Sequence, residues 1–307
     1  MTGQNDKNES WRIALKNLIE YNIFCIVRYF ISQLPLWAAS SASAFLWRLI
    51  APHLRRHKRA RSNLSIAIPE LYVHERERIL LEMWDNLGRT FAEAFHLHQI
   101  ADTEGSIEFN LTTDARNILE CNEPAVFVSL HAGNWEVTAI AAERFKKPLI
   151  GVYKRVENPY VDREVNKLRS RFYTAGLHSR APDTVKHILA AIKSGHSVAI
   201  MGDLRDSHGD VVPFFGLPSR STNFPALLAR RYNLNIVAIR AVRISPGHFR
   251  IDAEKLEISK TGSQTVDVRE NTGRIQLYLE KWIREDPSLW MWGHRRWNDT
   301  SLNLNND

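Results

Sequence analysis

Apolar residues recur along the chain with two different spacings. Helical periodicity occurs at 74–95, 159–175, 184–193, 222–233 and 266–285, and short apolar, β-branched runs occur at 125–130, 149–153, 197–201, 235–242 and 249–258. Strands that alternate with helices are typical of βαβ units. We therefore predict an α/β fold with a mixed, largely parallel sheet flanked by helices. Functional residues of such sheets gather where the parallel strands end.

The N-terminal region has a different pattern. No residue between Arg28 and Arg48 carries a formal charge, and aromatic residues lie throughout and around this stretch. A membrane-spanning helix needs about 20 predominantly apolar residues, whereas this segment contains Gln33, Pro35 and serines within 40–43. Two interfacial helices broken near Pro35, one tilted span and a pair of core helices all fit the pattern. Aromatic residues flanked by Lys and Arg favour the headgroup region, and among these we expect a single hydrophobic membrane anchor.

A cleaved signal peptide is a competing interpretation, because residues 42–44 (Ala-Ser-Ala) resemble a cleavage site. Arg28 and Pro35 would interrupt its apolar core. We therefore divide the chain into an N-terminal membrane-associating helical segment, 1–52, and a catalytic domain, 53–307.

The net charge of +7 is confined to the N-terminal region. Residues 1–62 hold ten Lys or Arg and three Asp or Glu, so the remaining residues balance. The basic run 53–61 suits anionic lipid, RNA, an acidic protein or a solvated helix face. Its position directly after the apolar segment favours an anionic membrane surface, and no nucleic acid is expected. Cys25 and Cys121 lack metal-ligand spacing, which indicates a reducing compartment and neither a disulfide framework nor a metal site.

The strongest chemical signal follows the run 126–130. The sequence His131-Ala-Gly-Asn-Trp-Glu136 begins where a buried strand is predicted to end and leads into an Ala-rich helix. A glutamate on the first helical turn can approach one imidazole nitrogen, which leaves the other as a general base. The alternative is a histidine at a strand end and a glutamate favoured by the helix dipole.

This hexapeptide matches the motif of the glycerolipid acyltransferase superfamily, a histidine separated by four residues from an acid. Its form resembles the late acyltransferases of lipid A biosynthesis, the lauroyl and myristoyl transferases. The resemblance extends from about Arg55 to Asn298. It includes 61–64, 68–70, 84–88 with Glu93, 151–159, 202–203, 211–216 and the Trp and His-Arg-Arg stretch 286–297.

The resemblance implies a membrane-associated O-acyltransferase. His131 and Glu136 are its catalytic residues, and backbone N–H groups near Gly133 and Asn134 are expected to stabilise an oxyanion. The implied substrate-binding residues are Asn134, Lys154, Arg155 and Asp203. Asp203 could also orient the site or pair with Arg205, and His294, Arg295 and Arg296 could bind phosphate or pack the last segment.

The implied donor is an acyl carrier protein or acyl-CoA, and the acceptor is a hydroxyl of a lipid A precursor. No cofactor or metal is implied, since the acyl thioester is a co-substrate. The expected location is the inner (cytoplasmic) membrane, with the catalytic domain facing the cytoplasm. Two alternatives remain: an acyltransferase for another glycolipid or an amino-acid lipid, and a non-enzymatic basic RNA-binding or membrane-scaffold protein.

This chain departs from the family pattern at three places. It has Lys154-Arg155 where the family usually has Arg-Pro, Leu204 where a Gln commonly follows the aspartate, and Phe224 where a Gly is expected. These departures concern the substrate and not the reaction class. The GxSxG, GxxxxGK and GxGxxG motifs are absent from the sequence, which argues against serine hydrolases, nucleotide hydrolases and dinucleotide enzymes.

Overall fold

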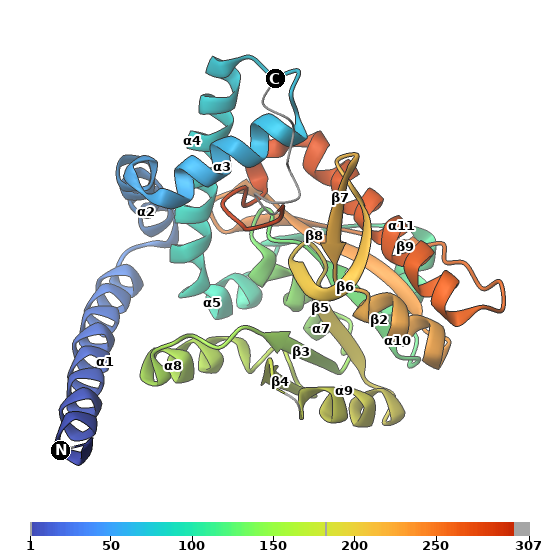
Figure 1. Cartoon of the computed structure of the whole chain (residues 1–307), viewed down its shortest axis with the longest axis horizontal. Coiled ribbons are helices and arrows are strands. Elements are labelled where there is room, and N and C mark those ends of the chain that lie inside the picture. The colour runs from blue at the N-terminus through green and yellow to red at the C-terminus, as the bar shows by residue number, and fades with distance from the viewer. Residues whose placement is uncertain (1, 182, 298–307) are drawn as a thin grey trace.

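The computed structural model describes residues 2–181 and 183–297, with side chains from residue 11 onward (Figure 1). The helices are α1 (Thr2–Gln33), α2 (Leu36–Ile50), α3 (Arg55–Ala67), α4 (Val73–Ala94), α5 (Leu97–Asp102), α6 (Thr113–Glu120), α7 (Thr138–Arg144), α8 (Pro159–Arg169), α9 (Thr184–Lys193), α10 (Phe224–Tyr232) and α11 (Gln264–Glu285). The strands are β1 (Ile107–Leu111), β2 (Ala125–Ser129), β3 (Leu149–Tyr153), β4 (Gly176–Ser179), β5 (Ser197–Met201), β6 (Arg205–Phe214), β7 (Leu217–Ser221), β8 (Asn235–Ser245) and β9 (His248–Leu256). Single 3₁₀ turns are η1 (Ala51–His53), η2 (Trp135–Val137) and η3 (Pro287–Leu289).

Seven strands form one mixed sheet in the order β1-β9-β8-β2-β5-β3-β4. Only the β8–β9 pair is antiparallel, and the other five pairs are parallel. β6 and β7 form a separate antiparallel hairpin. The prediction of a mixed, largely parallel sheet flanked by helices is confirmed.

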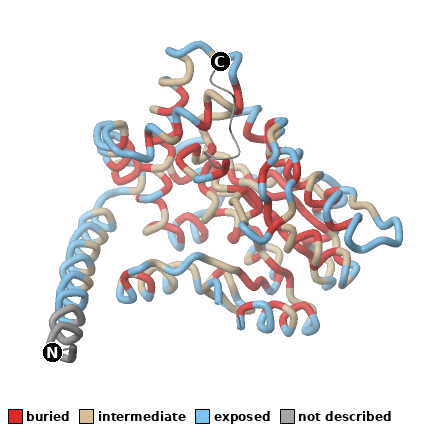
Figure 2. Tube along the Cα trace, in the orientation of Figure 1, coloured by how far each residue is buried: buried red, intermediate tan, exposed pale blue. Residues whose placement is uncertain are grey.

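Helices cover both faces of the sheet. Successive strand residues point to opposite faces, so neighbouring residues of one strand contact different helices. Val126 and Val128 of β2 pack in one cluster with residues of α9, α10 and α11. Phe127 between them packs in a second cluster with residues of α6 and α7. The buried residues accordingly gather in the body of the molecule, whereas α1 is mostly exposed from residue 11 onward (Figure 2).

The N-terminal helices differ in how they contact the rest of the molecule. α1 projects away from the body (Figure 1) and meets α8 through an ion pair of Arg28 with Glu164 at 2.7 Å. α2 begins after Pro35, so the predicted break near this proline is confirmed. α2 packs on α4 through small residues: Ser43 donates to the carbonyl of Gly88 at 2.7 Å, and a Cβ at Gly88 would lie 2.7 Å from the Cα of Ala44. Glycine is thus required for this close approach of two helices.

No helix in the described ranges has both the length and the apolar character to cross a bilayer, and the expected hydrophobic anchor stays a prediction. The packing of α2 also bears on the boundary expected after residue 52. Cutting there would uncover the buried face of α4, whereas α1 is the segment that stands apart from the sheet.

Candidate active site

The carboxyl ends of neighbouring strands bring the candidate residues together. β2, β5, β3 and β4 are consecutive and parallel in the sheet. His131 follows β2, Asp203 follows β5 and Lys154 follows β3. Because parallel strands end at the same edge of a sheet, residues far apart in sequence share one site.

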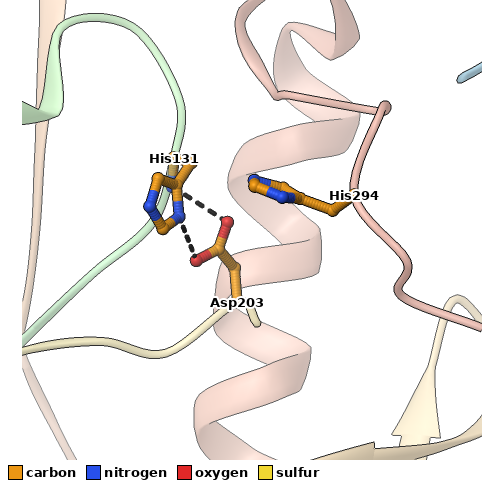
Figure 3. A group of neighbouring side chains, drawn as sticks. All are labelled: His131, Asp203 and His294. Atoms are coloured by element: carbon orange, nitrogen blue, oxygen red, sulfur yellow. Dashed lines mark hydrogen bonds and ion pairs between the residues drawn. The ribbon is translucent and has the colours of Figure 1, made fainter. Parts of the chain in front are cut away.

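Asp203 holds both the ring and the main chain of His131 (Figure 3). Its Oδ1 lies 2.9 Å from Nδ1 of His131, and its Oδ2 accepts the backbone N–H of His131 at 2.9 Å. Trp290 donates its indole N–H to Oδ2 at 2.8 Å. Burial alone would raise the pKa of Asp203, but the charge of His131 and its hydrogen bonds hold that pKa well below its usual range. The ionised carboxylate can only accept, so in the neutral form of His131 the proton is on Nδ1 and the lone pair is on Nε2.

His294 encloses this pair from the other side. Its ring points toward His131 and Asp203 (Figure 3), and its centroid lies 4.9 Å from that of His131 at an interplanar angle of 66°. Nε2 of His294 is buried and, within the part of the chain described, has no hydrogen-bond partner. Burial, together with the neighbouring His131, lowers the pKa of His294 to about 4. His294 is therefore neutral near pH 7 and packs against the site.

Among the described residues, Glu136 is paired with Arg169 and not with the His131 ring, which differs from the pairing expected from the sequence. Its Oε2 accepts Nε of Arg169 at 2.8 Å, and its Oε1 accepts a second nitrogen of the same guanidinium. Trp135 also donates its indole N–H to Oε1 at 3.1 Å. The reason is local geometry, since Glu136 lies within η2 and is directed to the last residue of α8. The imidazole partner comes instead from the adjacent strand.

The turn after the histidine depends on a glycine. Gly133 has φ +59°, and a Cβ there would lie 2.0 Å from the carbonyl oxygen of Ala241. Its N–H donates to the carbonyl of Leu289 at 3.1 Å, while the N–H of Asn134 is directed at the Ala241 carbonyl at 3.4 Å. Both N–H groups are thus directed at carbonyl groups of the fold, and an oxyanion site near this turn stays a prediction.

Asn134 is fully buried in a polar network instead of facing a substrate. Its Nδ2 donates to Oε2 of Glu93 at 2.9 Å, and its Oδ1 accepts the backbone N–H of Glu136 at 3.2 Å. Glu93 forms a two-pronged ion pair with Arg243 at 2.6 and 2.8 Å and accepts Ser40 of α2 at 3.0 Å. The amide of Asn134 is thus occupied within the fold, and the substrate-binding role expected for it stays a prediction.

A cavity of about 570 Å³ opens beside these residues. Its charged side chains and its histidine are His131, Glu136, Lys154, Arg169, Arg180 and Asp206. Its apolar lining comes from both sides of the sheet and includes Leu119, Phe127, Ala139, Ala142, Leu149, Ile188, Ile200 and Ile239. A mostly apolar cavity with a few polar groups suits a ligand with a hydrocarbon chain and one reactive end.

The two adjacent cations predicted to bind substrate are separated by the structure. Lys154 lines the cavity, but Arg155 does not; its side chain is 66% exposed and lies 3.7 Å from Asp162. Arg169 and Arg180 line the cavity and were missed by sequence reasoning. Arg169 belongs to a periodic helix without a motif, and Arg180 follows a strand that the apolar pattern does not reveal.

Two imidazoles and one carboxylate lie close enough to be considered as metal ligands. One ligand atom from each of His131, Asp203 and His294 lies within 4.8 Å of the others. The Asp203 oxygens, however, already accept three N–H groups. One of these is Nδ1–H of His131, and a protonated nitrogen has no lone pair with which to bind a metal. The geometry thus favours a proton-transfer site.

Fold and site together define an α/β protein with an oriented histidine at the edge of an apolar cavity. The family model for bacterial lipid A biosynthesis acyltransferases matches residues 9–299, and the chain belongs to this family. A lipid A biosynthesis acyltransferase of Haemophilus influenzae is 25% identical over 248 residues, which cover 79% of this chain and 77% of the relative. The resemblance drawn from the sequence and the prediction of an acyltransferase are confirmed.

Proposed function

We propose that the protein transfers a fatty acyl chain from a thioester donor to a hydroxyl of a lipid A precursor, with His131 as the general base. One observation carries this proposal. His131 lines the 570 Å³ cavity while its Nδ1 is held at 2.9 Å by an aspartate that is completely buried. An imidazole held in this way has the correct tautomer to accept a proton at Nε2.

The proposed reaction proceeds in two proton transfers. Nε2 of His131 takes the proton of the acceptor hydroxyl as that oxygen attacks the thioester carbonyl carbon. The resulting tetrahedral intermediate collapses, the carbon–sulfur bond breaks, and the imidazolium returns its proton to the departing thiolate. Asp203 stabilises the imidazolium through the Nδ1 hydrogen bond. We propose that the step uses no cofactor or metal.

We assign Glu136 a role through Arg169 instead of through the histidine. Burial lowers the pKa of Arg169, but the charge of Glu136 and its hydrogen bonds raise it above the ordinary value. The two opposite charges of this ion pair lie in one wall of the cavity and cancel each other. Glu136 is thus proposed as a positioning residue for the cavity wall.

The proposed donor is an acyl carrier protein or acyl-CoA, and the proposed location is the cytoplasmic face of the inner membrane. Support comes from the N-terminal surface. Large apolar side chains are exposed on α1 and α2, among them Tyr29 (62%), Phe30 (64%), Trp37 (66%) and Phe45 (62%). Exposed basic residues of α3, such as Arg55 and Lys58, follow this apolar surface in the chain. Apolar insertion combined with basic residues is the pattern of helices that lie in a membrane interface.

Substitution of the histidine tests the chemistry. We expect purified His131→Ala to lose transfer from acyl carrier protein to a lipid A precursor by at least about 100-fold, since positioned general bases contribute about 10² to 10⁴. The matched control is His98→Ala, because His98 is exposed and bonds only the carbonyl of Leu168 at 3.0 Å among the described residues. Near-normal transfer by His131→Ala with an intact fold would contradict the proposal.

Fractionation tests the membrane attachment. We expect the full chain to sediment with membranes at low salt and to be released by carbonate or high salt, as an interfacial protein is. A variant without residues 1–33 should bind vesicles more weakly while its circular dichroism spectrum remains that of a folded α/β protein. Full-length protein in the soluble fraction at low salt would overturn this part.

A further inference from the structure

We propose that Lys154 and Arg180 together bind a phosphoryl group at the edge of the catalytic cavity, and that Arg155 takes no part in this site. This inference rests on the proposed function, because it names the charged part of a substrate that reacts at His131. The sequence directed attention to Lys154 and Arg155 as neighbours in the chain. The sheet provides a different pair.

Strand register places the two cations side by side. β3 and β4 are parallel, with Tyr153 opposite Ser179, and the backbone N–H of Arg180 donates to the carbonyl of Tyr153 at 3.0 Å. Lys154 and Arg180 are therefore the first residues beyond the two paired strand ends. Both side chains line the cavity, whereas the side chain of Arg155 does not.

Charge pairing distinguishes these two cations from the third one in the cavity. Arg169 is neutralised by Glu136. Lys154 and Arg180 are exposed and have no ion-pair partner among residues 11–181 and 183–297. The other carboxylate in the lining is Asp206, and among the described residues no ion pair joins it to Lys154 or Arg180. To an incoming ligand, the cavity edge thus presents two positive charges that no ion pair within the described chain engages.

The chemistry of the two side chains fits a phosphoryl group. A guanidinium can donate two parallel hydrogen bonds to phosphate oxygens, and a lysine adds a mobile point charge. β3 and β4 are the second and third strands from β2. With adjacent strands roughly 4.8 Å apart, the phosphoryl group would lie about 10 to 15 Å from the reacting atoms at His131.

Two substrates carry a phosphate at some distance from their reacting group. One is the thioester donor, whose phosphopantetheine arm bears a phosphate. The other is the glycolipid acceptor, whose sugar can bear one. The shared ligand chemistry is a phosphoryl group, and the experiment separates its two sources.

Direct binding tests the site without turnover, so its outcome is independent of the catalytic proposal. Wild-type protein is titrated calorimetrically with inorganic phosphate, pantetheine 4′-phosphate and glucosamine 1-phosphate. We expect Lys154→Ala and Arg180→Ala each to weaken binding of at least one probe by about 10-fold or more, as removal of a charge-assisted hydrogen bond does. Arg155→Ala is the matched control and should bind as wild type does. Equal binding by wild type and both variants, or an equal loss in Arg155→Ala, would overturn the proposal.

Steady-state kinetics identify the source of the phosphate. If it belongs to the donor, Arg180→Ala raises KM for acyl carrier protein and acyl-CoA but not for an acyl N-acetylcysteamine thioester, which has no phosphate. If it belongs to the acceptor, KM rises for the phosphorylated acceptor but not for its dephosphorylated form. Arg180→Lys should restore part of the loss in either case. An unchanged KM in every arm contradicts the site, and circular dichroism of each variant excludes unfolding as the cause.

Discussion

Asp203 and His131 are 72 residues apart in the chain, yet the carboxylate of one contacts both the ring Nδ1 and the backbone N–H of the other at 2.9 Å. The contact arises because β2 and β5 are adjacent and parallel, with Ser129 opposite Met201. His131 and Asp203 each follow two positions after these paired residues. The aspartate, and not the nearby glutamate, is therefore the partner of the histidine.

Replacing the aspartate should remove most of the transfer rate. Asp203→Asn retains the size of the side chain but permits the wrong imidazole tautomer, so we expect kcat to fall by about 10² to 10⁴ with little change in KM. The control is Asp206→Asn, which changes a cavity carboxylate that does not bond to His131. Comparable kcat values for the two variants would show that the Asp203–His131 contact is dispensable.

Glu136 and Arg169 should behave as one unit. Glu136→Gln and Arg169→Gln each leave one charge uncompensated in the cavity, so we expect each to lower transfer by about 10-fold or more. The double variant should be no worse than the more damaged single variant, because residues in contact are not additive. A double-mutant cycle on kcat/KM measures this coupling. If Glu136 acted on the histidine directly, Arg169→Gln would leave the rate nearly intact.

Gly133 should tolerate no side chain. Gly133→Ala adds a Cβ 2.0 Å from a backbone oxygen at a position with φ +59°, so we expect a destabilisation of at least about 2 kcal/mol. Gly105→Ala is the matched control, since Gly105 has φ +73° with nothing within 4 Å of the added Cβ. That variant should lose only about 1 kcal/mol from backbone strain. Chemical denaturation of both variants measures the difference.

His294 should make the protein less stable in mild acid. Its pKa is about 4 in the folded state and about 6.5 in an unfolded chain. Between these values the unfolded state binds a proton that the folded state does not, so the free energy of unfolding falls as the pH is lowered from 6.5 to 4. His294→Phe retains a ring without this titration and should flatten that part of the profile. Denaturation at pH 7 and pH 4.5 provides the comparison, and parallel profiles would argue against a buried neutral histidine.

The central strands were predictable, and the outer ones were not. The predicted runs 149–153 and 197–201 coincide with β3 and β5, because a buried parallel strand is a short continuous apolar run. β1 lies at the sheet edge and alternates half-buried with exposed residues, and β4 at the other edge has no fully buried residue. β6 contains Gly209 and Pro213, and both residue types weaken a strand pattern.

Only those site residues that belong to one short segment of the sequence were predictable. His131 was found because it follows a recognisable strand. Its true partner depends on which strands are neighbours, and no spacing within the hexapeptide contains that information. The same limit applies to Arg180, which becomes a neighbour of Lys154 only through the register of β3 and β4.

The hydrogen bond from Ser40 to Glu93 limits how the N-terminal helices of this protein can be shortened. The same carboxylate accepts Asn134, so the helix with the exposed aromatic residues shares a buried acid with the catalytic turn. Truncation through α2 would remove the hydrogen bond that Ser40 donates to the buried carboxylate of Glu93. A variant with a less apolar surface is better made by Trp37→Glu and Phe45→Glu on the exposed face of α2, because the buried Ser40 and Ser43 then keep their hydrogen bonds.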